Sequence, residues 1–297
     1  MRQRERIYTL VVGDYSTGNG LLIDSLQMTF DVSKTSDNKN NGGNSASIEI
    51  YNLNATQRAL LEDKQYIEAT LSVGYRDIGT RVLVTGNVTE AVTRKAGDDY
   101  ITQLTMGEGY TDLNHTKLKS VVSPGSTVAD VIEAIRKEMP SVSRGAITGT
   151  NLNNPVVSGW RLSGTPREAL KKICEANKLE YSITGNVLNT TDVNGSFTKD
   201  VVNCPVLNEA TGLLETPFHR LQDAQLSKKD KQRRRGIQFK ALLNPLIVPG
   251  AIVKLESETI TGYYRVNAAR FAGDFRGNDW TVECTASEID LATVTVK

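Results

Sequence analysis

The sequence predicts a mainly β protein with an α+β insert. Two observations predict this fold class: apolar and polar residues alternate along both ends of the chain, as on half-buried strands, and helix-type spacing with strong start signals is concentrated in the middle third. The 297 residues are more than one ordinary core needs. We therefore expect three domains, with an antiparallel β domain over 1–111, an α+β insert over 112–200 and a second antiparallel β domain over 201–297.

The first third of the chain consists of predicted strands. Leu26, Met28, Phe30 and Val32 alternate with polar residues, which places one face of a strand on a core. The same pattern recurs four more times, at Ala46–Ile50, Ile67–Val73, Val82–Val88 and Tyr100–Met106. Several alternating strands separated by turn signals predict an antiparallel barrel or a sandwich.

Two other features interrupt these strands. A short helix is predicted to begin after Asn54, because Gln57 stands three residues later, which is the spacing of a capping box. The segment Thr35–Asn44 is polar and rich in glycine, so it is predicted to be a surface loop. The alternative for this loop is a segment that becomes ordered against a partner.

The middle third carries two predicted helices. Val128, Val131, Ile132 and Ile135 fall on one face of a helix that follows the Ser123–Thr127 turn. A second helix is predicted to begin at Thr165, with proline at the first helical position and glutamate three residues after the cap.

We expect this second helix to close in a left-handed turn at Asn177, before a strand at Leu179–Ile183. These elements make residues 112–200 a small α+β domain.

The last third returns to predicted strands, which lie at Ile237–Leu243, Ile252–Leu255, Tyr263–Phe271 and Trp280–Ala286. The strands within 45–109 and those within 236–288 therefore predict two separate barrels of similar size. No sequence repeat is strong enough to prove that one is a duplicate of the other.

The composition excludes several classes of protein. Hydrophobic residues make up 39 % of the chain and charged residues 23 %, so the chain is neither disordered nor membrane-like. No apolar run approaches the roughly 20 residues that span a bilayer, and the charged start does not lead into a signal-peptide core. We expect a soluble protein that is made in the cytoplasm. The net charge of +1 excludes a globally basic nucleic-acid binder but not a local basic patch.

The sequence offers little catalytic chemistry. His115 and His219 fall in different predicted domains, and neither is paired by motif with a nucleophile. The acidic pairs Asp98-Asp99 and Glu62-Asp63 would point their side chains apart or lie in turns, which is poor geometry for a glycosidase.

No metal-ligand spacing or phosphate-binding loop is present either. The three cysteines, Cys174, Cys204 and Cys284, are interpreted as reduced packing residues. We therefore expect no enzyme activity, no cofactor and no metal.

The sharpest local feature is a basic segment near the start of the last third. It holds six positive side chains in eight residues, namely Lys228, Lys229, Lys231, Arg233, Arg234 and Arg235. Such a run is typically a hydrated loop between strands. The functional alternative is contact with an acidic protein partner or with a nucleic-acid backbone. No aromatic residue lies between Leu221 and Ile237 to stack on bases, so a protein is the better of these two partners.

Several motifs, taken in order, resemble one known family. The stretch Ala241–Ser257 (ALLNPLIVPGAIVKLES) and the following Gly262–Val266 carry the clearest similarity. Ile48–Leu53, Val73–Tyr75 and Val84–Val88 match in the first third. On these motifs the chain resembles the baseplate (tail) hub proteins of contractile-tailed bacteriophages, the late control protein D-like family of tube-domain hubs.

The resemblance implies a mechanical role. Such hubs form homotrimers in which each protomer supplies two tube-like β-barrels, so three chains make a ring of six barrels. The ring would match the hexameric tail tube on one side and the trimeric spike on the other, and would line the channel for DNA without sequence specificity. Tape measure and baseplate wedge proteins are further expected partners. The expected location is the virion tail baseplate, after synthesis in the host cytoplasm.

The family also suggests the nature of the insert, since Ser123–Ile135 and Ser163–Cys174 resemble a LysM-like module. The chain departs from the family at Met106–Glu108, where many relatives carry an aspartate, and in the Lys228–Arg235 segment, which has no counterpart there. A peptidoglycan-binding or peptidoglycan-cleaving tail protein is the alternative function. The sequence does not separate a phage from a bacteriocin or a secretion-type injector.

Overall fold

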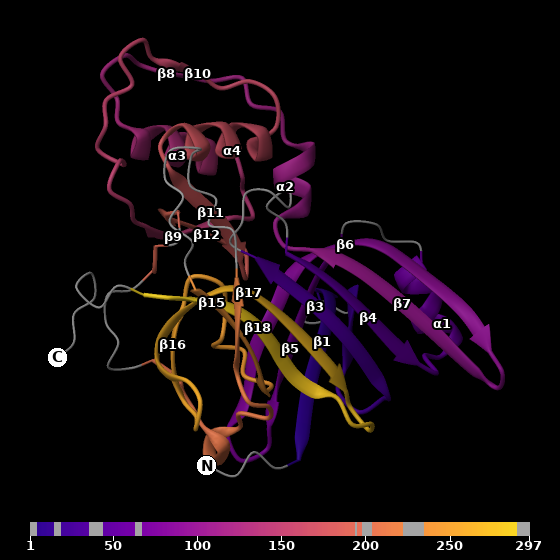
Figure 1. Ribbon diagram of the computed structural model, residues 1–297. Helices are drawn as coiled ribbons and strands as arrows, with labels where there is room; N and C mark the ends of the chain where they lie inside the picture. Colours follow the sequence, from indigo (N-terminus) through magenta and orange to yellow (C-terminus); the bar gives the residue numbers. More distant parts are fainter. Residues whose placement is uncertain are drawn as a thin grey trace.

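The computed structural model describes residues 5–14, 19–35, 44–62, 67–193, 195–197, 204–221 and 235–289 (Figure 1). The architecture is mainly β, with one large antiparallel sheet and a helical insert. We call the elements that precede the insert the first β unit. They are β1 (Arg6–Asp14), β2 (Asn19–Ile23), β3 (Met28–Thr35), β4 (Ser45–Tyr51), α1 (Ala55–Glu62), β5 (Glu68–Tyr75), β6 (Gly79–Ala96) and β7 (Asp99–Gly107).

The insert runs from α2 to β12 and has its own core. Figure 1 shows it standing above the large sheet, with the three-stranded sheet β11-β12-β9 nearest to that sheet and the β8–β10 pair at the far end. Its elements are α2 (Tyr110–His115), β8 (Val121–Val122), α3 (Val128–Lys137), β9 (Ser143–Ile147), β10 (Trp160–Arg161), α4 (Pro166–Ala176), β11 (Leu179–Thr184) and β12 (Val187–Asp192).

We call the elements that follow the insert the second β unit. They are β13 (Val206–Leu207), the short 3-10 helix η3 (Glu209–Thr211), β14 (Phe218–Leu221), β15 (Arg235–Leu242), β16 (Ile252–Glu256), β17 (Thr261–Asp274) and β18 (Trp280–Glu288).

The two β units have the same strand order. The first reads β3-β4-β7-β6-β5-β1 and the second reads β14-β15-β18-β17-β16-β13. From β3 to β7 and from β14 to β18 the corresponding strands also follow one another in the same chain order, and every neighbouring pair among them is antiparallel. The sequence shows no such repeat, because strand pairing depends on alternation rather than on residue identity.

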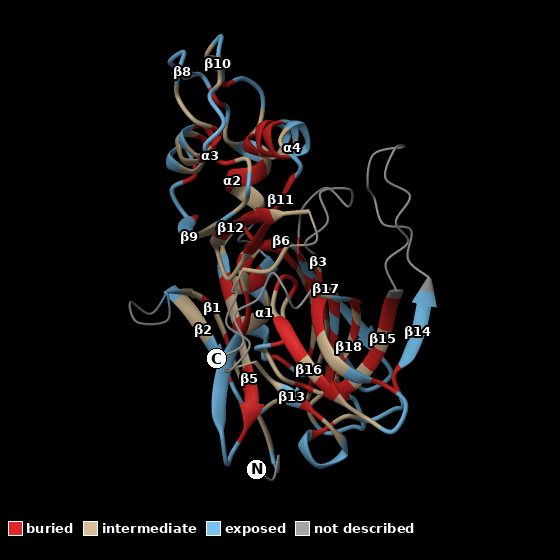
Figure 2. Ribbon diagram, turned by 60° about the vertical axis from the view of Figure 1, so that its left-hand side comes forward, coloured by how far each residue is buried: buried red, intermediate tan, exposed pale blue. Residues whose placement is uncertain are grey.

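The two units share one sheet and one core. The second half of β17 pairs with β3, so the large sheet holds 13 strands from both ends of the chain. One cluster of buried side chains extends through both units, whereas the insert has a separate cluster. Figure 2 shows buried segments in strands of both units and in α3 and α4 of the insert. The sequence predicted two separate barrels, and the continuous sheet differs from that picture at this junction. A LysM-like insert and the domain boundaries at 111 and 200 stay predictions.

Close packing holds the β17–β3 junction. The Phe30 ring meets Trp280 edge-on, with ring centroids 5.3 Å apart. A Cβ atom on Gly273, which pairs with Phe30, would lie 2.2 Å from the Phe30 ring. Glycine is therefore required at position 273 by the close approach of an aromatic side chain.

Most of the local predictions are confirmed. Asn54 and Gln57 exchange both hydrogen bonds of a capping box before α1. Thr165 and Glu168 form the predicted box at the start of α4, and Thr127 forms a box with Asp130 at the start of α3.

The predicted left-handed turn at Asn177 is wrong by one residue, because Lys178 has the positive φ of 56°. The Asn177 side chain caps the helix by another route, since its Nδ2 donates a hydrogen bond to the carbonyl of Ile173 at 2.8 Å.

Candidate assembly surface

The face of the large sheet that points away from the core is polar. Strand alternation places Ile48 and Ile50 in the core and Ser47 and Glu49 on the opposite face. Across eight strands, from β14 to β6, this face carries hydroxyls, amides and charges that include Thr29, Asp31, Ser33, Ser45, Gln103, Thr105, Gln238, Lys240, Arg270, Glu283 and Thr285. We call it the polar sheet face.

Many charges on the polar sheet face are already paired. Arg94 Nη2 lies 2.7 Å from Glu49 Oε1, and Arg270 Nε donates to Asp31 Oδ2 at 2.8 Å. Lys240 Nζ lies 3.6 Å from Glu283 Oε1. Because acids and bases alternate at short range, this face has no strong charge of one sign.

A buried carboxylate joins the first β unit to the insert. Glu108, only 1 % exposed, follows β7 and pairs with Lys34 Nζ at 3.3 Å. It also accepts hydrogen bonds from Asn44 Nδ2 at 2.6 Å, from the Thr85 amide at 3.4 Å and from the Gly185 amide at 2.9 Å. Because Gly185 lies in the turn between β11 and β12, one side chain fixes the insert to two strands of the sheet.

A buried arginine joins the second β unit to the same insert. Arg265 on β17 is 1 % exposed and forms an ion pair with Glu180 on β11. Its Nε donates to the Gly195 carbonyl at 2.7 Å, and its Nη1 donates to Asn267 Oδ1 at 2.7 Å. Burial lowers the pKa of Arg265 to about 10, so the guanidinium still carries its charge at neutral pH opposite Glu180. The insert is therefore held by both β units.

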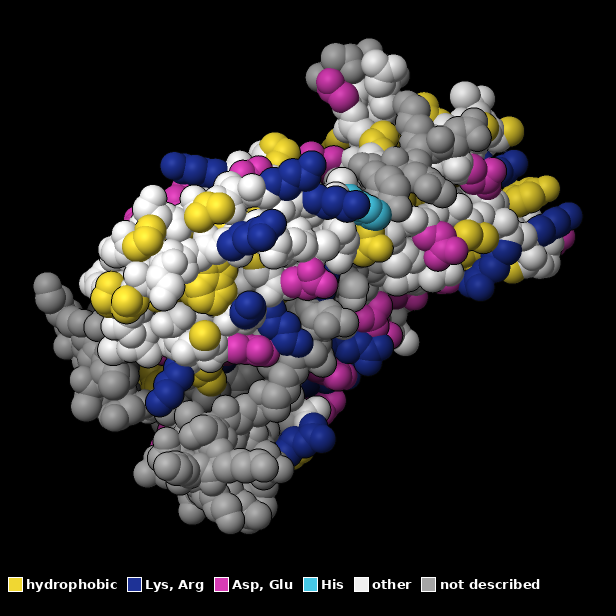
Figure 3. Space-filling view, turned by 90° about the horizontal axis from the view of Figure 1, so that it is seen from above, with side chains coloured by type: hydrophobic (Ala, Val, Ile, Leu, Met, Phe, Trp, Pro, Cys, Tyr) yellow, Lys and Arg dark blue, Asp and Glu magenta, His cyan; other side chains and the backbone are white. Residues whose placement is uncertain are grey.

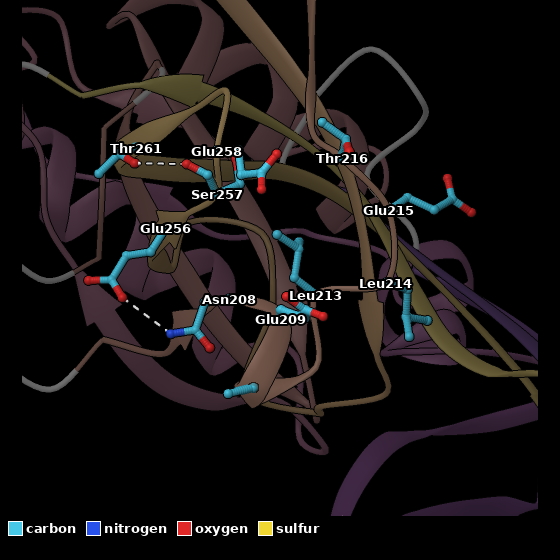
Figure 4. A pocket seen from close by; sticks show the side chains of 11 residues that line it. Asn208, Glu209, Leu213, Leu214, Glu215, Thr216, Glu256, Ser257, Glu258 and Thr261 are labelled. Atoms are coloured by element: carbon cyan, nitrogen blue, oxygen red, sulfur yellow. Dashed lines mark hydrogen bonds between the residues drawn. The ribbon is translucent and has the colours of Figure 1, made fainter.

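One hollow in the described part of the chain lies in the second β unit. It has a volume of about 900 Å³ and is lined by four glutamates, Glu209, Glu215, Glu256 and Glu258, together with Leu213 and Leu214 (Figure 4). Glu256 is already engaged, because Lys254 Nζ lies 2.6 Å away and Asn208 Nδ2 donates to it at 3.2 Å. These hydrogen bonds, first that of Lys254, lower the pKa of the Glu256 carboxyl.

The far end of the insert exposes small apolar side chains. Val121 on β8 is 71 % exposed and Val157 is 81 % exposed. Figure 3 looks down on this end and shows hydrophobic side chains scattered among Lys and Arg rather than gathered in one patch.

The predicted basic site lies almost entirely outside the described residues. Lys228, Lys229, Lys231, Arg233 and Arg234 are not described, and of Arg235 only the backbone is described, at the start of β15 opposite Leu221. Its role as a partner-binding segment stays a prediction.

The residues weighed for catalysis are dispersed. His115 lies in α2 of the insert, beside the Tyr110 ring, and His219 lies on β14 of the second β unit. Asp99 accepts a hydrogen bond from Asn52 at the base of the β6–β7 turn. In the described ranges no three His, Cys, Asp or Glu side chains are grouped to hold a metal ion.

The cysteines are packing residues, as predicted, at two positions. Cys174 and Cys284 are buried, and burial raises the pKa of Cys174 to about 12. Cys204 is partly exposed. Among the residues that the structure describes, no helix has the length and apolar character to cross a bilayer.

Glu108, Glu180 and Arg265 were not predicted from the sequence as functional positions. Met106–Glu108 stood out only as a departure from a family pattern, and Arg265 only as part of a motif. A charged residue inside an otherwise apolar strand is the signal that could have found Arg265.

Known structures share this fold. No protein-family model matches the chain, and no curated protein matches it. A tail protein from Neisseria meningitidis is similar at 12 % identity with a TM-score of 0.67, covering 97 % of this chain and 98 % of that one. A 43 kDa tail protein of a Shewanella oneidensis prophage is similar at 11 % identity with a TM-score of 0.62, covering 94 % and 97 %.

A component of a bacterial secretion system has a similar structure. An E. coli component of the type VI secretion system, which itself shows structural similarity to the T4 bacteriophage tail proteins gp27 and gp5, is similar at 10 % identity with a TM-score of 0.63. The match covers 91 % of this chain and 75 % of that one. The chain therefore has the fold of phage tail proteins and of a tail-like secretion component.

Proposed function

We propose that this chain is a structural hub of a contractile-tail baseplate, where a homotrimer joins the hexameric tail tube to the trimeric central spike. The observation that carries the proposal is the repeated strand order within one chain. Two equivalent β units per chain become six in a trimer, so a threefold assembly can present an approximately sixfold ring. The fold shared with phage tail proteins supports the same role.

In this proposal each β unit is one tube-like barrel and the LysM-like insert is a spacer. The buried Glu108 and Arg265 contacts support a fixed spacer, because they tie the insert to both units. A closed ring also covers strand edges that would otherwise invite uncontrolled pairing.

The polar sheet face would line the channel. Its paired charges and hydroxyls would allow DNA to pass without sequence-specific or strong electrostatic contact. Tape measure and baseplate wedge proteins are further partners in this proposal, and the assembled particle is its location. The proposed role is not enzymatic, and a peptidoglycan-binding or peptidoglycan-cleaving tail protein is the alternative.

Light scattering on the full chain, alone and with its tail tube and spike proteins, tests the proposal. The expected mass is three times the 32.5 kDa of one chain. A chain that stays monomeric at tens of micromolar and binds neither the tube nor the spike protein would contradict it.

A further inference from the structure

One junction inside the chain serves as a template for a junction between copies. Past the end of β16, the second half of β17 pairs with β3, the first strand of the other unit's repeated set. By the shared strand order, β6 corresponds to β17 and β14 corresponds to β3.

β6 and β14 each have an edge segment that pairs with no other described strand. Within the described residues the second half of β6, from Glu90 to Ala96, pairs with β7 alone, and β14 pairs with β15 alone. Figure 1 shows the end of β6 projecting on one side of the molecule and β15, the partner of β14, on the other side. The two edges therefore cannot pair with each other within one chain.

We propose that Glu90–Ala96 of β6 in one copy pairs in antiparallel fashion with β14 of the next copy. This inference rests on the proposed function, because it names the contacts that would close its ring. The contact is head-to-tail, so it either closes into a ring or continues without end. In a trimer, three internal β17–β3 junctions would alternate with three β6–β14 junctions between copies.

The internal junction also sets the register. A bulge shifts the register between β17 and β18 at Asn267, and another bulge shifts the register between β6 and β7 at Thr89. Phe271, which pairs with Val32, lies four residues after its bulge, so its counterpart in β6 is Thr93.

The row of paired residues that crosses the sheet gives the other partner. In the first unit this row runs Val88, Met106, Ala46, Val32, and in the second it runs Val266, Ala286, Ile237, His219. Thr93 would therefore lie opposite His219 of the next copy. In the same register Val92 lies opposite Arg220, and Arg94 lies opposite Phe218.

The exposed apolar residues fit this register. Val92 is 48 % exposed and Phe218 is 51 % exposed, and both are on open edges. They occupy the positions of Arg270 and Asp31, which form an ion pair diagonally across the internal junction. The junction between copies would thus have an apolar diagonal contact where the internal junction has a charged one, and burial of Phe218 would favour association.

Disulfide cross-linking of the full chain tests the pairing. Val92→Cys with Arg220→Cys places two cysteines directly opposite, where Cα atoms lie about 4.5–5.5 Å apart and a disulfide can form. The partly exposed Cys204 is replaced by serine in all variants. The matched control is Val92→Cys with His219→Cys, because a shift of one residue sends the second side chain to the other face.

The expected result is a ladder of covalent dimer and trimer that stops at trimer, at least tenfold stronger than in the control. Equal cross-linking in both variants, or none in either while light scattering gives a trimer, would overturn the β6–β14 pairing and leave the proposed hub standing. A monomeric chain would overturn both.

Discussion

The two β units differ in the side chains at corresponding edges, although their strand order is the same. At corresponding positions the internal junction has Arg270 and Asp31, whereas the open edges have Val92 and Phe218. The units also meet the insert with opposite charges, Glu108 from the first and Arg265 from the second. The same strand order therefore carries different side chains at corresponding edges, charged at the internal junction and apolar at the open edges.

The largest expected effect is at the Arg265–Glu180 ion pair, which joins the second β unit to the insert. Arg265→Met leaves Glu180 buried without its partner, so we expect a loss of about 3–5 kcal/mol in the free energy of unfolding. Urea denaturation measures it. The control is the double variant Arg265→Met with Glu180→Leu, which we expect to recover much of the loss. A double variant as unstable as the single one would show that the ion pair is not the cause.

Removing the Glu108 contacts, which join the first β unit to the insert, should cause a smaller loss of stability. Glu108→Gln replaces one carboxylate oxygen by an NH₂ group. Its hydrogens would then face N–H donors such as Asn44 Nδ2 and the Gly185 amide, so we expect a loss of about 2–3 kcal/mol in the free energy of unfolding. The same denaturation experiment measures it, with Glu175→Gln on the exposed face of α4 as control. A change below 0.5 kcal/mol, which is typical of surface substitutions, would contradict the role of Glu108 in joining the first β unit to the insert.

The internal junction should be sensitive to a single methyl group. Gly273→Ala forces a Cβ against the Phe30 ring, so we expect a loss of about 1–3 kcal/mol. In a Phe30→Leu background the same change should cost less, because the ring is gone. Equal costs in both backgrounds would contradict the packing described at this junction.

The chemistry of the two junctions can be exchanged. Val92→Arg places a charge in the apolar contact between copies, and we expect about tenfold weaker assembly, near 1.4 kcal/mol. Adding Phe218→Asp recreates the ion pair of the internal junction and should restore assembly in a salt-dependent way. Sedimentation at low and high salt measures both. A double variant that assembles no better than Val92→Arg would break the correspondence between the junctions.

The smallest expected effect is at the exposed ion pair itself. Arg270 and Asp31 have side chains that are 63 % and 38 % exposed, so Arg270→Ala should cost less than about 1 kcal/mol. The cost should shrink further in high salt. A loss above 2 kcal/mol at any salt concentration would mean that the internal junction depends on this pair more than on Phe30 and Gly273.

The sequence predicted the local structure more fully than the contacts between distant residues. The Thr165–Glu168 box and the alternation of Met28, Phe30 and Val32 depend on neighbours along the chain, so they could be recognised. Glu108 meets Lys34 and Gly185, which are 74 and 77 residues away, and no local pattern encodes that meeting. The prediction at Asn177 was wrong because the side-chain amide of Asn177 caps the helix, and the left-handed position falls to Lys178.

The repeated strand order could not be predicted for a different reason. The corresponding rows pair Met106 with Ala46 in one unit and Ala286 with Ile237 in the other, so large and small residues have exchanged strands. Because the residue identities at corresponding positions differ, the repeat cannot be recognised in the sequence.

Electron cryomicroscopy of the isolated chain tests the proposed ring. We expect a closed ring of six similar β lobes with threefold symmetry, in which β6 of each copy lies beside β14 of the next. Isolated two-lobed particles, or rings in which these two strands face solvent, would contradict it.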